Sequence, residues 1–129
     1  GPWRMTVLSM GNPHAVILVD DPAAVPLERV GPVIEHAPVF PERINVEFIA
    51  VRSRREIDFR VWERGSGPTL ACGTGACAAV AAGVLNGLLD KGEPVTVHLP
   101  GGDLEIVWHE NGHVFMTGPA AFVCDGVLL

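Results

Sequence analysis

The stretch from Pro68 to Leu85 places a reactive residue type at the predicted start of an apolar helix, because Cys72 is followed directly by Gly73, Thr74 and Gly75. The first turn of a helix carries main-chain N–H groups without intrahelical partners, and the helix dipole makes this end electropositive. A cysteine there has its thiolate stabilised, which lowers its pKa below the free value of about 8.5. The glycines let a carboxylate or phosphate approach the main chain closely. The sequence therefore predicts a reactive cysteine beside an anion site.

The three cysteines have different expected roles. The alternative for Cys72 is an inert, buried thiol, but its place at a glycine-flanked helix start favours reactivity. Cys77 lies farther along the apolar helix and is expected to pack in the core, and Cys124 is expected in a strand. The Cys-x4-Cys spacing lacks the paired arrangement of structural zinc sites, so we expect no metal. No Lys-Ser/Thr pair follows Gly73, which makes a small carboxylate a better ligand than a nucleotide.

A carboxylate is predicted to arrive beside this cysteine at the end of a strand. In residues 56–63, Ile57, Phe59 and Val61 share one face, and the alternation of a strand places Glu63 on the same side. Burying a carboxylate without partners is costly, so Glu63 should be hydrogen-bonded or lie where a ligand meets it. Arg64 follows, and a Gly-Ser-Gly-Pro turn then leads into the cysteine segment.

The elements that must position these residues are strands around one helix. The helix, expected from about residue 74 to 89, is apolar nearly all round, so protein must surround it. A short, interrupted surface helix is expected over residues 26–36. Eight strands are predicted, over residues 5–10, 14–19, 45–51, 56–63, 95–99, 104–108, 113–117 and about 121–124. The predicted fold class is therefore α+β, an eight-stranded, barrel-like antiparallel or mixed sheet wrapped around a central apolar helix.

Composition excludes several classes of protein. The chain has 129 residues, 48% of them hydrophobic, which suits one compact domain over residues 1–129. A net charge of −6 without a block of basic residues argues against nucleic acid or an anionic membrane as partner. An odd number of cysteines without disulfide spacing favours a reducing cytoplasm. No signal peptide is recognisable, and the longest apolar segment, residues 76–89, is too short for a membrane span.

The motifs together resemble a known enzyme family. The chain contains, in order, Gly11-Asn12-Pro13-His14, Arg43-Ile44-Asn45, Glu63-Arg64-Gly65, Ala71-Cys72-Gly73-Thr74-Gly75-Ala76-Cys77 and Thr117-Gly118-Pro119-Ala120. In order and spacing these resemble the C-terminal half of diaminopimelate epimerase, and the likeness covers essentially the whole chain. Proline racemase and phenazine-biosynthesis-type proteins are related, but they lack the Asn-Pro-His turn and the Glu-Arg-Gly approach to the cysteine.

The resemblance implies a cofactor-independent epimerase that interconverts LL- and meso-2,6-diaminopimelate in lysine and peptidoglycan biosynthesis. Two cysteines on opposite faces of the α-carbon transfer the protons, and Cys72 is implied to be the one that accepts the proton in the LL-to-meso direction. The main-chain N–H groups of Gly73 and Thr74 are implied to bind the α-carboxylate. Further implied substrate-binding residues are Asn12, Asn45, Glu63 and Arg64, and the residues implied to tune the thiols are His14 and Glu63.

The chain departs from the family in two respects. The family enzyme has two similar lobes and about twice this length, so the N-terminal lobe, with the second cysteine, is absent here and the chain alone is expected to be inactive. The family's tyrosine before the terminal Asp-Gly, which is associated with dimer formation, is replaced by Cys124. The resemblance therefore does not decide whether this chain forms a homodimer. Two alternatives remain: a non-catalytic, carboxylate-binding lobe, and a lobe of a phenazine-biosynthesis-type isomerase in which Cys72 is dispensable.

Overall fold

The computed structural model describes residues 5–40, 43–65, 67–69, 73–109, 112–117 and 123–127. These residues form one mixed sheet with the strand order β1-β2-β3-β4-β6-β7-β8-β9, and β5 pairs with β4 off this path. The strands are β1 (Met5–Ser9), β2 (Pro13–Leu18), β3 (Asn45–Ser53), β4 (Glu56–Glu63), β5 (Gly67–Thr69), β6 (Val95–Leu99), β7 (Gly102–Trp108), β8 (His113–Thr117) and β9 (Val123–Val127). The helices are α1 (Leu27–Glu35), α2 (Gly73–Leu85) and the short 3-10 helix η1 (Pro22–Ala24).

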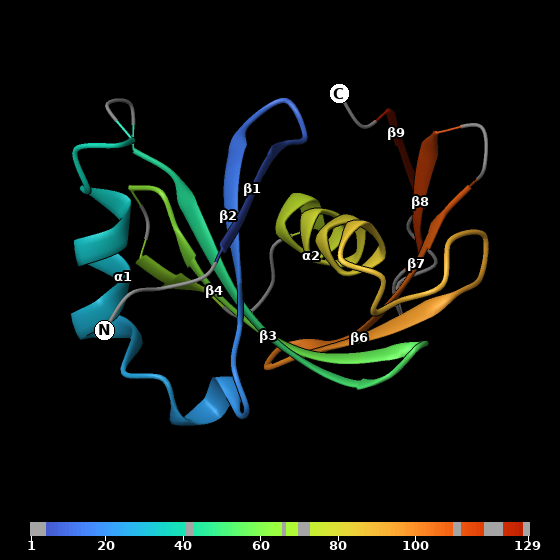
Figure 1. Ribbon diagram of the computed structural model, residues 1–129, viewed down its shortest axis with the longest axis horizontal. Coiled ribbons are helices and arrows are strands. Elements are labelled where there is room, and N and C mark those ends of the chain that lie inside the picture. The colour runs from blue at the N-terminus through green and yellow to red at the C-terminus, as the bar shows by residue number, and fades with distance from the viewer. Residues whose placement is uncertain are drawn as a thin grey trace.

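Two parallel pairings determine where the helices lie. Strand β2 runs parallel to β3, and β4 runs parallel to β6, while the remaining neighbours are antiparallel. The β2–β3 connection contains α1 and the β4–β6 connection contains α2. Because β2 and β4 run in opposite directions, right-handed crossovers place the two helices on opposite faces of the sheet. Figure 1 shows this arrangement, with α1 outside the sheet and α2 inside its curve.

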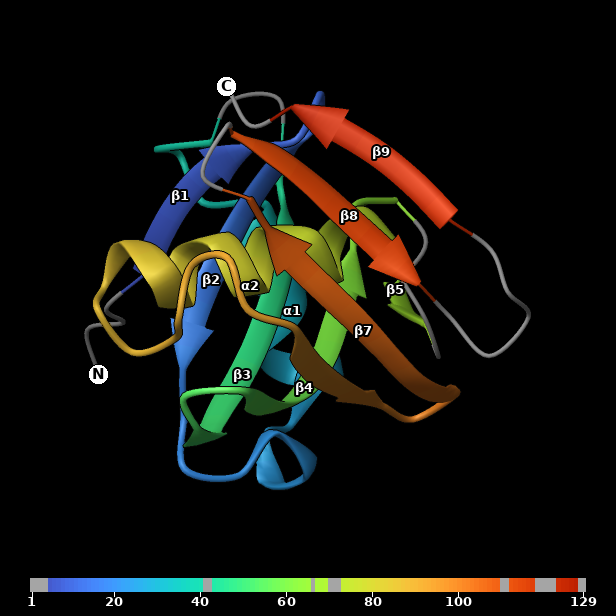
Figure 2. The ribbon, with the colours of Figure 1, turned by 90° about the vertical axis from the view of Figure 1, so that its right-hand side faces the viewer.

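Helix α2 is the centre of the larger core, as its composition predicts. Every residue from Gly75 to Gly83 is buried. The helix packs against side chains from both parts of the sheet, including Phe59 of β4 and Ile106 of β7. In Figure 2, β7, β8 and β9 pass on one side of α2 while β2, β3 and β4 lie on the other. The prediction of an apolar helix surrounded by protein is therefore confirmed.

Helix α2 ends at Leu85, earlier than the predicted end near Leu89. Gly87 has φ +74°, its N–H donates to the carbonyl of Val84, and the N–H of Leu88 donates to the carbonyl of Gly83. This is the glycine-terminated Schellman arrangement. The chain then folds back, so that a Cβ on Gly83 would lie 2.3 Å from Cδ1 of Leu89.

Helix α1 covers the opposite face with a smaller core. It is continuous through Pro32, so the expected interruption is wrong. Gly31 fits a close contact, because a Cβ there would lie 2.4 Å from two ring atoms of Trp62. Leu27 and Ile34 of the helix pack with Phe48 of β3 in this second cluster.

The sheet differs from the prediction in its strand number and closure. Nine strands are present among the described residues rather than eight, because Gly67–Thr69 forms the short β5. Gly67 and Pro68 are residue types typical of turns, so the sequence predicts a turn here rather than a strand. The sheet curls around α2 but remains open, since β1 and β9 end the strand order and no pairing joins them in the described part of the chain. The last strand occupies Val123–Val127 instead of residues 121–124, of which 121 and 122 lie outside the described residues.

Candidate active site

Polar side chains gather on the α2 face of the sheet where β2 and β3 begin and β4 ends. His14 of β2 is the register partner of Asn45 in the parallel pair. Side chains alternate along a strand, so Asn45 and Glu47 share a face with Ile49, which packs in the α2 core. Glu63 shares the face of Val61 for the same reason. The register therefore brings four polar residues from three neighbouring strands to one region.

The imidazole of His14 is held from both edges. Its Nδ1 hydrogen-bonds Oε1 of Glu47, and its Nε2 lies 3.1 Å from Oδ1 of Asn12, in the turn between β1 and β2. His14 and Glu47 both have an exposed fraction of 0%. The ring orientation is thus fixed, with Nε2 directed toward the turn that carries Asn12.

Glu47 is a site residue that the sequence reasoning missed. Burial raises the pKa of its carboxyl, the hydrogen bond and charge of His14 oppose this, and the nearby charge of Glu63 adds to it, with the result that the pKa is about 7. Its second oxygen, Oε2, is buried and has no hydrogen-bond partner among the described residues. The available signal was strand alternation, which places Glu47 on the same core-facing side as Asn45 and Ile49.

Asn45 connects the three strands through their main chains. Its Nδ2 donates to the carbonyl of Pro13 at 3.0 Å, and its Oδ1 accepts from the N–H of Arg64 at 2.7 Å. Asn45 is 5% exposed. The side chain predicted to contact substrate therefore also fixes the turn that carries Glu63 and Arg64.

A carboxylate from α1 fixes the other side of the same turn. Glu35 accepts from the N–H of Gly65 at 3.1 Å and from Nε1 of Trp62 at 2.7 Å. Burial alone would raise the pKa of Glu35, but the Trp62 and Gly65 hydrogen bonds and the charges of His36 and Arg43 outweigh it and lower the pKa. The Glu63-Arg64-Gly65 turn is consequently held between Glu35 and Asn45.

The start of α2 is where the sequence predicted the anion site. The helix begins at Gly73, directly after Cys72, which lies outside the described residues. Gly73 is half-buried and a Cβ on it would lie 2.9 Å from Cε of Met116 in β8, while Thr74 is exposed. Cys77 is buried in the α2 core, as predicted. Cys124 falls within β9, also as predicted.

The predicted site residues thus fall into two groups. The first is one connected network of hydrogen bonds and close charges, made by Asn12, His14, Asn45, the main chain of Arg64, and Glu63. The second is the start of α2, with Gly73 and Thr74. Among the described residues no group of three His, Cys, Asp or Glu side chains is arranged to hold a metal ion. No described helix is both long enough and apolar enough to cross a membrane.

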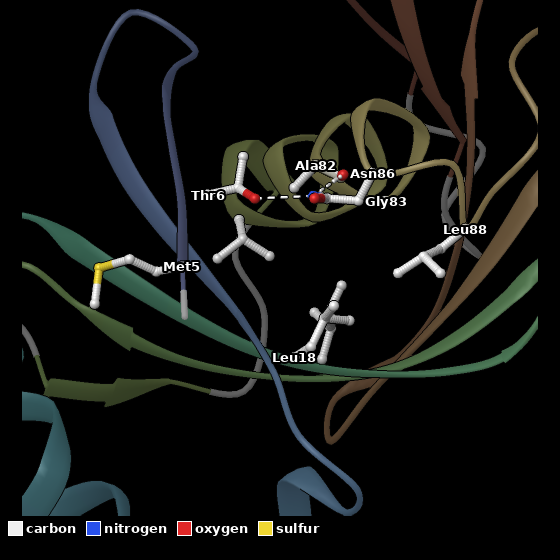
Figure 3. A pocket seen from close by; sticks show the side chains of 9 residues that line it. Met5, Thr6, Leu18, Ala82, Gly83, Asn86 and Leu88 are labelled. Carbon is white, nitrogen blue, oxygen red and sulfur yellow. Dashed lines mark hydrogen bonds between the residues drawn. The ribbon is translucent and has the colours of Figure 1, made fainter. Parts of the chain in front are cut away.

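A separate cavity of about 200 Å³ lies at the opposite end of α2. Asn86 closes one side of it by donating from Nδ2 to Oγ1 of Thr6 at 2.9 Å (Figure 3). The remaining lining is mostly aliphatic: Met5, Val16, Leu18, Ile49, Ala82, Gly83 and Leu88. None of the predicted site residues lines this cavity, so the polar network is the stronger candidate for a catalytic or binding site.

The fold is similar to part of solved structures of PhzF-family proteins. A phenazine biosynthesis protein of the PhzF family from Bacillus anthracis matches 88% of this chain and 38% of its own, with a TM-score of 0.59 and 22% sequence identity. A PhzF-family protein from Enterococcus faecalis matches 88% of this chain and 42% of its own, with a TM-score of 0.61 and 13% identity. At these identities the likeness concerns the fold alone.

Sequence comparison gives the family. The model of the diaminopimelate epimerase family matches residues 6–123, and the chain belongs to that family. Proteins named diaminopimelate epimerase from Bacillus cereus and Bacillus anthracis are 59% identical over 125 residues, which is 97% of this chain. The chain spans 43% of the length of these relatives.

Proposed function

We propose that residues 1–129 are the C-terminal lobe of a diaminopimelate epimerase, which interconverts LL- and meso-2,6-diaminopimelate without a cofactor. The observation that carries the proposal is the network that joins Asn12, His14 and Asn45 to the Glu63-Arg64 turn, in a chain whose apolar helix begins directly after Cys72. Membership of the epimerase family supports the substrate. The rest of the enzyme would supply a second lobe with a second cysteine.

In the proposed reaction the thiolate of Cys72 removes the α-proton, so that an S–H bond forms as the C–H bond breaks. The electron pair stays on the substrate and spreads into its carboxylate. The thiol of the second lobe then gives its proton to the opposite face of the α-carbon. An α-proton is far less acidic than a thiol, so the developing charge needs stabilisation, which the N–H groups of Gly73 and Thr74 at the start of α2 would provide.

The remaining site residues would bind and tune. Asn12, Asn45, Glu63 and Arg64 are proposed to hold the amine and the far end of the substrate. His14 and Glu63 are proposed to tune the thiols. Asn45 would bind substrate and also fix the turn after β4. Its hydrogen bonds to the carbonyl of Pro13 and the N–H of Arg64 hold the end of β4 that carries Glu63. A closed cleft between the lobes would exclude water and strengthen these electrostatic contacts.

The experiment measures exchange of the substrate α-proton into deuterated water with LL- and meso-diaminopimelate. The chain joined to its second lobe should convert both isomers, and the 129-residue chain alone should not, because it lacks a second proton donor. Cys72→Ala in the two-lobed protein should lower turnover at least about 100-fold, the scale of a lost general base. Cys77→Ala is the matched control, since Cys77 is buried in the α2 core. Near-normal turnover by Cys72→Ala would contradict the proposal.

One alternative is an isomerase of the phenazine-biosynthesis type, which the fold likeness favours. It predicts that Cys72 is dispensable. A non-catalytic, carboxylate-binding lobe predicts instead an inert Cys72 that alkylates with the pH profile of a free thiol, whose pKa is about 8.5.

A further inference from the structure

Glu35, the last residue of α1, is a buried carboxylate on the face of the sheet opposite α2 (Figure 1). Its Oε1 accepts from Nε1 of Trp62 and its Oε2 accepts from the main-chain N–H of Gly65, so both oxygens take donors from the end of β4 and the turn after it. Burial acts to raise the pKa of Glu35, but these hydrogen bonds and the charges of His36 and Arg43 lower it. Glu35 is therefore an ionised acceptor at neutral pH, directed at the turn.

The main chain of this turn is held on both sides of one residue, Arg64. The N–H of Arg64 belongs to the peptide group before its Cα and donates to Oδ1 of Asn45 at 2.7 Å. The N–H of Gly65 belongs to the peptide group after that Cα and donates to Glu35 at 3.1 Å. Each peptide group is planar, so restraining both of them restrains the φ and ψ angles of the residue between them. Those angles set the direction in which the Cα–Cβ bond of Arg64 leaves the main chain.

The two residues that hold the turn come from opposite faces of the sheet. Asn45 shares the α2 face with Ile49, whereas Glu35 reaches the turn from α1. Asn45 is 5% exposed and Glu35 is 3% exposed, while Arg64 is exposed. A buried carboxylate costs stability even when it has partners, and anchoring α1 to the sheet does not require a bond to a turn beyond the strand. The position of Glu35 therefore indicates a function in directing the exposed side chain of Arg64.

We propose that Glu35 is a positioning residue of the site: through the N–H of Gly65 it sets the direction in which Arg64 presents its guanidinium to the far-end carboxylate of the substrate. This inference rests on the proposed function, which assigns Arg64 to substrate binding. A guanidinium has hydrogen-bond donors only, so the group that it binds at the far end of diaminopimelate is the carboxylate and not the amine. Glu35 itself touches no substrate, because it acts through the main chain of the turn.

The test measures KM and kcat for LL-diaminopimelate in the two-lobed protein, with and without Glu35→Gln. Glutamine has a single side-chain oxygen, so it can accept from Trp62 or from Gly65, but its NH₂ group then faces the other donor. KM should rise about tenfold while kcat changes less than about twofold, because a binding contact made equally in the ground and transition states is weakened. Glu28→Gln is the matched control, with the same substitution at an exposed position of the same helix, and it should change neither value.

A second comparison separates positioning from a general effect on the fold. Glu35→Gln is repeated in a protein that carries Arg64→Ala. If Glu35 acts through Arg64, the rise in KM should disappear in this background, because the side chain that would be misdirected is already absent. An equal rise in both backgrounds would overturn the inference. A loss of kcat at unchanged KM would also overturn it, since that result indicates only a smaller folded fraction.

Failure of the inference differs from failure of the proposed function. In both of the overturning results, the wild-type two-lobed protein still converts diaminopimelate and the proposed function stands. If the wild-type two-lobed protein does not convert diaminopimelate, the proposed function fails and the role of Glu35 fails with it.

Hydrogen exchange in the unmodified protein covers the case in which Glu35→Gln does not fold. Without substrate, the amide proton of Gly65 should exchange at least about tenfold more slowly than in an unstructured chain, because its bond to Glu35 is present in the free protein. Exchange at the unstructured rate would show that Glu35 does not hold the turn, and the inference would then be wrong.

Discussion

In the described part of the sheet, histidines meet carboxylates in one cluster at His14 and in another at His98, and the two clusters differ mainly in exposure to water. His14 and Glu47 join β2 to β3 beneath α2 and are both fully buried. His98 of β6 lies 2.5 Å from Glu56 of β4 and 2.9 Å from Asp103 of β7, and its side chain is 34% exposed. The same residue types therefore meet in a dry and in a wet environment.

Exposure to water decides which residue of each cluster has a shifted pKa. In the buried pair, loss of water around the carboxyl dominates and raises the pKa of Glu47 to about 7. In the surface cluster, the hydrogen bonds to Asp103 and then Glu56 dominate and raise the pKa of His98. Burial thus produces a carboxyl that exchanges protons near neutral pH, which suits proton-transfer chemistry. Exposure produces an ordinary surface ion pair that connects three strands.

Removal of one carboxylate from each cluster is the strongest test of this contrast. Glu47→Ala leaves Nδ1 of His14 buried without a partner and opens a cavity, so we expect a loss of about 4 kcal/mol in the free energy of unfolding. Glu56→Ala should lose less than about 1 kcal/mol, because water replaces the lost partner of His98. Urea unfolding of the 129-residue chain, followed by circular dichroism, measures both values. Equal losses would show that the two clusters do not differ in the way proposed.

The pH dependence of stability should also separate the clusters. The pKa of Glu47 is raised from 4.5 to about 7, so its contribution to stability is fully present below about pH 4.5 and is lost as the pH rises through 7. A shift of that size corresponds to roughly 3 kcal/mol. Unfolding free energies at a series of pH values would measure this fall in wild type. In Glu47→Gln the fall should disappear, and if it persists another group is responsible.

The buried cluster also shows how far the sequence could predict the site. Strand alternation predicts Glu63 on the inner face of β4, and the charge of Glu63 does act on the buried Glu47. The all-apolar composition of α2 correctly predicted a helix enclosed by sheet. The resemblance to the epimerase family identifies His14 as a candidate for tuning the thiols. Its partner Glu47 was missed because the pairing depends on the parallel register between β2 and β3, which joins residues 33 positions apart.

The differences between the predicted and the observed fold also arise from contacts between residues far apart in the sequence. Strand β5 has only three residues, with Pro68 in the middle. So short a strand shows no alternating sequence pattern, and it depends on tertiary pairing with β4. The end of α2 was placed too late because apolar residues continue to Leu89, which packs back on Gly83 instead of extending the helix. Closure of the sheet could not be predicted from strand number, because it depends on whether the two outermost strands meet.

The smallest expected effect concerns the surface cluster. The pKa of His98 is raised, so its contribution to stability is present below its unfolded pKa of about 6.5 and is lost as the pH rises through its higher folded value. Because the cluster is solvated, we expect this contribution to be only about 0.5 kcal/mol and to decrease in added salt. The difference in unfolding free energy between wild type and His98→Gln, measured at pH 5.5 and 8.5 with and without 0.5 M (about three times physiological) salt, tests this. A salt-independent difference larger than about 2 kcal/mol would mean that His98 is shielded like His14, and exposure would then no longer explain the contrast between the clusters.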